Sequence, residues 1–374
     1  MSKFFTLLSC RVAFFFRIFA PMKQNSVTPS ELIGQLRLPL VILVTYAHSY
    51  GAVDPDYSLL TSEWDSYEVL KLLVSQTLVK VVVPVFFMIS GYLFFNNVER
   101  WNLHVYGGKL KRRLWTLFLP YVVWNILMAV KLNHSNSSFH FSLSSIWSQW
   151  EKAGIQTDWL GMEHWMTAPC NMPLWFLRDL MVVSLLSPLV YWLIRHWGRW
   201  VIAVLTAVYL SGIGAFPLPG LSMYAVYFFS LGAFLSIHRH DPIAVALRFE
   251  KPASVLSLLL AGAMMLTYRT PLFSPLMLGF RLTGAVVVVC LAYRLLTNTL
   301  HRQSAVVCRS SYFLYLGHYV FFLSFIDAWM LSIPHSTLLF CVHYLAAPLL
   351  KAVLFVLAYQ LWNRLWTMFF SVKK

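Results

Sequence analysis

Long apolar runs separated by short polar segments cover most of the sequence. A helix that crosses a bilayer needs roughly 20 predominantly apolar residues, and about ten of the runs are candidates for such a helix. The pattern therefore predicts an all-α, polytopic membrane helical bundle with about ten transmembrane helices. The predicted spans are 31–51, 69–96, 114–132, 173–194, 199–214, 220–237, 253–268, 275–296, 311–331 and 340–366.

Charges in the loops predict how this bundle is oriented across the membrane. The loop 49–68 carries Asp and Glu but no Lys or Arg, whereas the next loop, 97–113, is rich in Lys and Arg. The alternation continues along the chain, so the basic loops gather on one side. Because cytoplasmic loops of membrane proteins carry an excess of Lys and Arg, we expect both termini in the cytoplasm.

The pattern divides the chain into three regions. In residues 1–30, basic residues interrupt the apolar ones too often for a membrane span, so we expect a basic amphipathic segment and a linker. Residues 31–366 form the membrane domain, and 367–374 are a short cytoplasmic tail. The largest outer loop, 133–172, is polar and aromatic and is expected to form a lid or interfacial helices.

Composition excludes several other classes of protein. Hydrophobic residues make up 59% of the 374 residues and charged residues only 11%, whereas a soluble domain has roughly 25% charged residues. Basic cytoplasmic loops explain the net charge of +15, and no dense basic tract indicates nucleic-acid binding. The five cysteines are scattered singly, so neither a disulfide framework nor a metal site is expected.

The first predicted span, 31–51, carries two ionisable side chains, Arg37 and His48. They are about three helical turns apart, so they share one face of the helix and are separated along its axis by roughly 16 Å. An ionisable group at membrane depth is costly unless it faces a protein interior or a water-filled cavity. We therefore interpret this pair as part of a functional site.

The second predicted span adds a lysine next to helix-breaking residues. Pro84 and Gly91 permit a bend where Ser90 or a neighbouring helix re-satisfies the backbone, and a bend lets a cavity form. Lys80 lies four residues before Pro84 and needs a partner or a cavity.

A basic cluster follows at the cytoplasmic mouth of the bundle. Arginine offers bidentate hydrogen bonds to phosphate, so Lys111, Arg112 and Arg113 suit a phosphorylated ligand. Taken alone, the cluster is explained better by anchoring of a cytoplasmic loop than by ligand binding.

Five stretches together resemble a known family. They are the Arg37 and His48 pair, PVFFMISGYL at 84–93 with Lys80 before it, the basic run at 111–124 that leads into proline-tyrosine and tryptophan, LWFLRDL at 174–180, and SYFLYLGH at 311–318. In this order they resemble the acyltransferase-3 family of multi-pass membrane acyltransferases. The similarity covers about 31–366. One position departs from the family pattern, since Thr116 stands where the family often has a second arginine.

The resemblance implies O-acylation, most often O-acetylation, of a cell-surface or lipid-linked saccharide in the bacterial cytoplasmic (inner) membrane. The acyl group would come from cytoplasmic acyl-CoA, such as acetyl-CoA, as a co-substrate, with no permanently bound cofactor and no metal. The matching arginine and histidine, Arg37 and His48, are regarded as essential in the family. Some members carry a fused esterase-like domain, for which this chain has no room, so the membrane domain or a separate partner is expected to meet the acceptor.

The chemistry of acyl transfer assigns roles to these residues. Transfer from a thioester to a hydroxyl needs a base near neutral pH, and histidine has an unperturbed pKa of about 6.5. We therefore expect His48 to be the general base. Arg37 is expected to hold phosphates of the donor, together with Lys111, Arg112 and Arg113, and Lys80 is a candidate for stabilising the oxyanion.

Other candidates keep two interpretations each. Arg178 and Asp179 form a structural network or line the site, and His318 contacts the donor or packs between helices. Arg281 and Lys351 line a cavity or complete an ion pair. In the outer loop, Glu163, His164 and Trp165 bind the acceptor or form a solvated loop.

A transporter or flippase of a lipid-linked saccharide is the alternative function, because it would share the spans and the intramembrane charges. A common transporter architecture repeats its motifs in both halves, and PVFFMISGYLFF has no counterpart after residue 200. The acceptor, the position acylated, the acyl group and any homo-oligomer stay open, as does the choice between direct transfer from the CoA arm and an acyl relay across the membrane.

Overall fold

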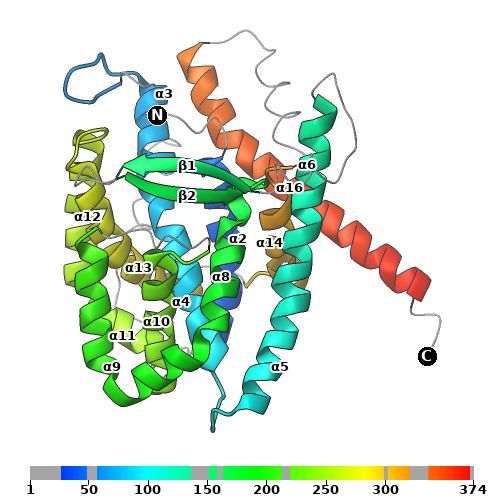
Figure 1. The fold of residues 1–374 in the computed structure, drawn as a ribbon. Helices are drawn as coiled ribbons and strands as arrows, with labels where there is room; N and C mark the ends of the chain where they lie inside the picture. The colour runs from blue at the N-terminus through cyan, green and yellow to red at the C-terminus, as the bar shows by residue number, and fades with distance from the viewer. Residues whose placement is uncertain are drawn as a thin grey trace.

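A computed structural model describes residues 27–48, 57–135, 151–157, 163–212, 220–298, 302–320 and 336–370 (Figure 1). These residues are almost entirely helical, which confirms the predicted helical class for this part of the chain. The amphipathic segment predicted for the N-terminal region lies largely outside the described residues. The elements are α2 (Pro29–Ala47), α3 (Ser66–Lys71), η1 (Leu72–Thr77), η2 (Leu78–Val81), α4 (Val82–Phe95), α5 (Leu103–Arg113), η3 (Leu114–Phe118), α6 (Leu119–Ser135), β1 (Glu151–Thr157), β2 (Glu163–Pro169), η4 (Met172–Leu174), α8 (Trp175–Leu185), α9 (Ser187–Leu210), α10 (Met223–Ile237), α11 (Pro242–Arg248), α12 (Glu250–Leu266), α13 (Phe273–Asn298), α14 (Ala305–Gly317) and α16 (Thr337–Phe370).

Five helical segments in the described ranges are long and apolar enough to cross a membrane: Pro29–Ala47, Ser66–Phe95, Leu103–Leu132, Phe273–Asn298 and Thr337–Leu365. A sixth span results if Met172–Leu185 and Ser187–Leu210 count as one, although these two helices bend by 63° at their junction. Other predicted spans correspond to shorter helices, such as α10 and α14. The chain is thus a multi-pass membrane protein by helix length and composition, while about ten spans and cytoplasmic termini stay predictions.

Three prolines inside the bundle lack the N–H that an α-helix would offer to the carbonyl four residues earlier, and a side chain far along the sequence contacts each of these carbonyls. Before Pro39, the Gln35 carbonyl accepts a hydrogen bond of 3.4 Å from the Gln303 side chain. Before Pro84, the Lys80 carbonyl accepts one of 3.5 Å from the Tyr224 hydroxyl.

The third case is the shortest of these hydrogen bonds. Before Pro120, the Thr116 carbonyl accepts a hydrogen bond of 2.5 Å from the Tyr312 hydroxyl. Thr116 lies in the π-helical turn η3. The bilayer core has no water to replace such a partner, so these three contacts fix the positions of α2, η2 and η3 against the later helices.

Glycine lets two helices of the bundle touch at their backbones. A Cβ on Gly91 in α4 would overlap the Phe229 carbonyl of α10, and a Cβ on Gly232 in α10 would overlap the Met88 carbonyl of α4. Small residues permit such close approach in membrane helices, where packing rather than the hydrophobic effect holds helices together. The glycine of the PVFFMISGYL motif therefore has a packing role.

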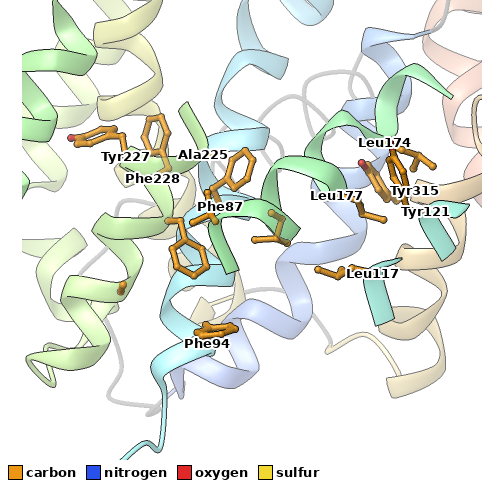
Figure 2. Packing of buried hydrophobic residues seen from close by; sticks show 14 of the residues in the cluster. Phe87, Phe94, Leu117, Tyr121, Leu174, Leu177, Ala225, Tyr227, Phe228 and Tyr315 are labelled. Atoms are coloured by element: carbon orange, nitrogen blue, oxygen red, sulfur yellow. The ribbon is translucent and has the colours of Figure 1, made fainter. Parts of the chain in front are cut away.

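The main core joins α4, α8, α10 and α14 with the η3–α6 segment (Figure 2). Phe87 of α4 and Phe228 of α10 are completely buried, and Figure 2 shows them facing the space between these helices. Tyr315 of α14 lies beside Leu174 and Tyr121 in the same view, and its hydroxyl donates to the Pro173 carbonyl over 2.5 Å. Ring-to-ring packing therefore ties the first half of the chain to α14.

The outer loop differs from one of its two predicted forms. Residues 151–157 and 163–169 do not form interfacial helices, because β1 and β2 pair as antiparallel strands, with Glu151 opposite Pro169; a lid stays a prediction. The hairpin crosses one end of the bundle (Figure 1). Strand pairing depends on which residues meet across the turn, and neither segment has the apolar 3.6-residue period of a helix. At the opposite end of the bundle lie the start of α5 and the bend of α9 (Figure 1).

Candidate functional site: two histidines among buried cations

Two histidines that are far apart in the sequence meet inside the bundle. His48 follows the last residue of α2 and His318 follows the last residue of α14, and these two helices pack against each other. Their ring centroids are 5.4 Å apart, with the rings tilted by 44°. The Tyr319 ring meets the His48 ring edge-on, at 5.6 Å. The sequence identified each histidine as a candidate, and the fold brings them together.

The hydrogen bonds of His318 define its protonation. Its side chain is completely buried, and Nδ1 lies 2.8 Å from the Tyr315 carbonyl oxygen. A carbonyl only accepts, so Nδ1 is the donor, and in the neutral ring Nε2 carries the lone pair. Within the described residues, this buried Nε2 has no hydrogen-bond partner. A neutral His318 ring therefore carries its unprotonated nitrogen at Nε2, and this ring lies beside the His48 ring.

Positive side chains surround the histidine pair. Lys80 in η2 is close enough for its charge to act on His48, and Arg281 of α13 is close enough to act on Lys80. Lys351 of α16 is completely buried and acts on His318. The interior beside the histidines therefore favours a ligand or transition state that carries negative charge.

Arg281 shows how the fold holds one of these cations in place. Its guanidinium carbon lies 4.6 Å from the centre of the Tyr224 ring, and the Tyr209 ring lies 6.4 Å from the Tyr224 ring. Its Nε atom is buried and lacks a hydrogen-bond partner in the described part of the chain. Tyr224 also contacts the Lys80 carbonyl, so one tyrosine supports both cations. Neither Tyr224 nor Tyr209 could be predicted as part of the site, because neither lies in a charged or motif-bearing segment.

Arg37 lies at the other end of the same helix pair. Its side chain is exposed on α2 and lies near Cys308 of α14. Gln35, two residues earlier, hydrogen-bonds to Gln303 just before α14 through its side-chain amide and its carbonyl. Arg37 therefore pairs with the start of α14 and His48 with its end. The two helices run parallel, and we call the line along which they pack the α2–α14 seam. The predicted separation of roughly 16 Å between Arg37 and His48 lies along this seam.

The basic cluster at the end of α5 divides into exposed and inward-facing residues. Lys111 and Arg112 are exposed, whereas Arg113 is partly buried, with its guanidinium carbon 5.2 Å from the centre of the Phe94 ring. Arg113 also lies near Tyr312 of α14. Of the three predicted donor-binding residues, Arg113 is therefore the one that the fold turns toward the helix carrying His318.

Arg178 and Asp179 form a network of their own. The Arg178 guanidinium donates to Asp179 Oδ1 over 3.1 Å, and Asp179 Oδ2 accepts a hydrogen bond of 2.6 Å from Ser222. Ser222 caps the N-terminus of α10. Asp179 is buried and its oxygens hold neighbouring elements, which supports the structural interpretation, while a role of the pair in lining the site stays a prediction. Ser90 is partly buried in α4, one residue before the close α4–α10 contact.

Glu163, His164 and Trp165 lie in β2, where His164 pairs with Gln156 of β1. Their side chains lie outside the described part of the structure. The hairpin places their backbone at the end of the bundle opposite the start of α5 (Figure 1). Binding of an acceptor by these residues stays a prediction.

The long apolar helices and the buried ionisable groups define an integral membrane protein with an internal polar site. Residues 33–372 match the family profile described as an acyltransferase domain, so the chain belongs to the acyltransferase-3 family and is a membrane acyltransferase. This confirms the resemblance inferred from the order of the motifs. The succinoglycan biosynthesis protein ExoH of Rhizobium meliloti (strain 1021) is 25% identical over 354 residues, which cover 90% of this chain and 89% of that protein. No solved structure gives a significant match.

Proposed function

We propose that this protein is a bacterial inner-membrane O-acetyltransferase that acts on a polysaccharide. It transfers the acetyl group of cytoplasmic acetyl-CoA to a hydroxyl of a surface or lipid-linked saccharide. Family membership supports acyl transfer, and the name of the succinoglycan biosynthesis protein supports a polysaccharide as the acceptor. The observation that carries the proposal is the meeting of His48 and His318 at one end of the α2–α14 seam, with Arg37 at the other.

His48 serves as the general base in this proposal. It takes the proton of the acceptor hydroxyl, and the alkoxide oxygen attacks the thioester carbonyl to give a tetrahedral oxyanion. The C–S bond then breaks, and the CoA thiolate leaves with the proton that His48 held. The His318 ring lies beside the His48 ring, and its unprotonated Nε2 can exchange this proton.

The cations divide between the two ends of the seam. Lys80 is close enough to His48 to stabilise the oxyanion, and Arg281 supports Lys80. Arg37 and Arg113 hold the donor phosphates, with Lys111 and Arg112 contributing long-range attraction from their exposed positions. The pantetheine arm then extends along the α2–α14 seam toward the histidines, which accounts for the separation of arginine and histidine.

The proposal fixes the orientation of the bundle. The end that carries the start of α5 and the bend of α9 faces the cytoplasm, together with both termini and the basic loops of a bundle of about ten spans. The β1–β2 hairpin then faces the outside (Figure 1). Glu163, His164 and Trp165 of this hairpin meet the saccharide there.

Mass spectrometry of the surface glycan tests the function. Cells that lack the protein are complemented with the wild type, His48→Ala or Arg37→Ala, and membrane levels of each variant are matched by immunoblot. We expect the wild type alone to restore one acetyl group on an otherwise intact glycan. Restoration by both variants contradicts the mechanism, and loss of the whole glycan without the protein supports the transporter alternative instead.

A further inference from the structure

A second basic site lies at the same end of the bundle as the start of α5. A pocket of about 200 Å³ is lined by Phe95, Val98, Glu99, Tyr191, Arg195, Ile237 and Arg239. These residues come from the end of α4, the first half of α9 and the end of α10. The pocket therefore opens where three elements end or bend, away from the histidine pair.

The two arginines of this pocket are available to a ligand. Arg195 and Arg239 are exposed, and within the described residues neither forms an ion pair with Glu99 or with another acidic residue. With one glutamate against two arginines, the lining keeps a net positive charge. Two guanidinium groups from different elements around one space suit a phosphate, which accepts bidentate hydrogen bonds from each.

Arg239 occupies a backbone position where glycine is the usual residue. Its φ of 56° lies in the left-handed region, and it follows the C-cap His238 of α10. The main-chain N–H of His240 donates to the Leu235 carbonyl over 2.8 Å, and that of Arg239 to the Ser236 carbonyl over 3.1 Å, which completes a Schellman motif. A side chain in the left-handed conformation is strained, so an arginine here points to a function for its charge.

An aromatic layer joins this pocket to the inward-facing arginine of the basic cluster. The Phe95 ring stacks on the Tyr191 ring with centroids 5.9 Å apart, and Tyr191 stacks on Trp101 at 5.3 Å. Trp101 also contacts the Phe94 ring at 6.0 Å, and Phe94 carries the Arg113 guanidinium on its face. A series of contacting rings, Tyr191, Trp101 and Phe94, thus leads from the pocket to Arg113.

We propose that Arg195 and Arg239 bind the phosphates at the nucleotide end of the acyl-CoA donor, beside Tyr191. This assignment rests on the proposed function, because it takes acyl-CoA as the donor. The nucleotide end of CoA carries a phosphate monoester and a diphosphate, whose combined negative charge exceeds what Arg37 and Arg113 neutralise. The pocket supplies the additional charge next to an aromatic layer.

Binding of 3′,5′-ADP tests the site without any acyl transfer. The full chain is purified in phosphatidylcholine nanodiscs, and the affinity is measured by calorimetry for the wild type, Arg195→Gln, Arg239→Gly, Arg239→Lys and a control. Arg199→Gln is the matched control, since Arg199 is an exposed arginine of the same helix α9 that does not line the pocket. We expect Arg195→Gln and Arg239→Gly to weaken binding about 10-fold, Arg239→Lys less than about 3-fold, and the control to bind as the wild type.

Arg239→Gly gives two readouts that move in opposite directions. Glycine relieves the left-handed strain, so the thermal transition should rise by about 1–2 °C while nucleotide binding weakens. A variant that only disturbed the fold would lower both. The KM for acetyl-CoA should rise about 10-fold with kcat within about 2-fold of the wild type, because the pocket lies away from the histidines.

The other possible results distinguish failure of the nucleotide site from failure of the proposed acetyltransferase function. Unchanged nucleotide affinity in both arginine variants overturns the site, even where acetyl transfer proves the function. Loss of affinity in a protein that transfers no acetyl group supports the site and contradicts the function. A further experiment measures the thermal transition of the wild type and the two arginine variants in nanodiscs that contain phosphatidylglycerol. If the variants lose stabilisation by this lipid and keep nucleotide affinity, the pocket binds lipid headgroups and the assignment is wrong.

Discussion

Replacing Tyr312 by phenylalanine removes one hydroxyl group and keeps the aromatic ring. That hydroxyl donates to the Thr116 carbonyl over 2.5 Å, and Pro120 lacks the N–H that an α-helix would offer to this carbonyl. Thr116 and Tyr312 are both exposed on the bundle surface, where lipid offers no replacement partner. We expect Tyr312→Phe to lower the free energy of unfolding by about 1–2 kcal/mol, which is near the upper end for membrane hydrogen bonds.

A double-mutant cycle separates this reason from simple loss of packing. Pro120→Ala supplies an N–H for the Thr116 carbonyl, so in that background Tyr312→Phe should cost only about 0.3 kcal/mol. Steric trapping in bicelles measures the four unfolding free energies. Tyr268→Phe is the control, because the Tyr268 hydroxyl has no hydrogen-bond partner among the described residues. Equal costs in both backgrounds would refute the role of the proline.

Three further predictions concern the site and the packing around it. Arg113→Gln should raise the donor KM about 10-fold in a transfer assay, whereas Lys111→Gln should change it less than about 2-fold, because only Arg113 turns inward. His318→Asn keeps a donor for the Tyr315 carbonyl and removes Nε2. The protein should therefore fold while kcat falls about 100-fold. An unchanged kcat would mean that His318 only packs between helices. Gly232→Ala forces α4 and α10 apart and should destabilise the protein by about 1–3 kcal/mol in thermal unfolding, whereas Gly262→Ala, with open space at its Cβ, should be neutral or stabilising.

The apolar pattern located most helices of the described chain because bilayer thickness sets their length. The predicted span 275–296 corresponds to α13, and 253–268 to α12, within a few residues at each end. The predicted boundary between 173–194 and 199–214 is different in the structure. There, α9 continues to Leu210 through a kink at Trp197, and the break falls earlier, after Leu185.

Site residues were predictable where one helix carried them and unpredictable where two helices meet. Arg37 and His48 follow from their spacing on α2, but the approach of His318 depends on the packing of α14 along α2. Lys80 was visible as a charge in an apolar span, whereas its neighbour Arg281 became meaningful only once α13 was placed. The β1–β2 hairpin was missed because strand pairing is a contact between segments.

The carbonyls four residues before the three prolines have a consequence for biogenesis. The side chain that donates to each carbonyl comes much later in the sequence. The separation is 268 residues for the Gln35 carbonyl, 196 for the Thr116 carbonyl and 144 for the Lys80 carbonyl. During synthesis the early helices therefore enter the bilayer with open acceptors, which stay costly until α10 and α14 arrive. The segments that carry Arg37, Lys80 and Arg113 reach their final positions only when the late helices insert. A chain interrupted before Gln303 would expose the Gln35 and Thr116 carbonyls to lipid, although the Lys80 carbonyl would already have its partner in α10.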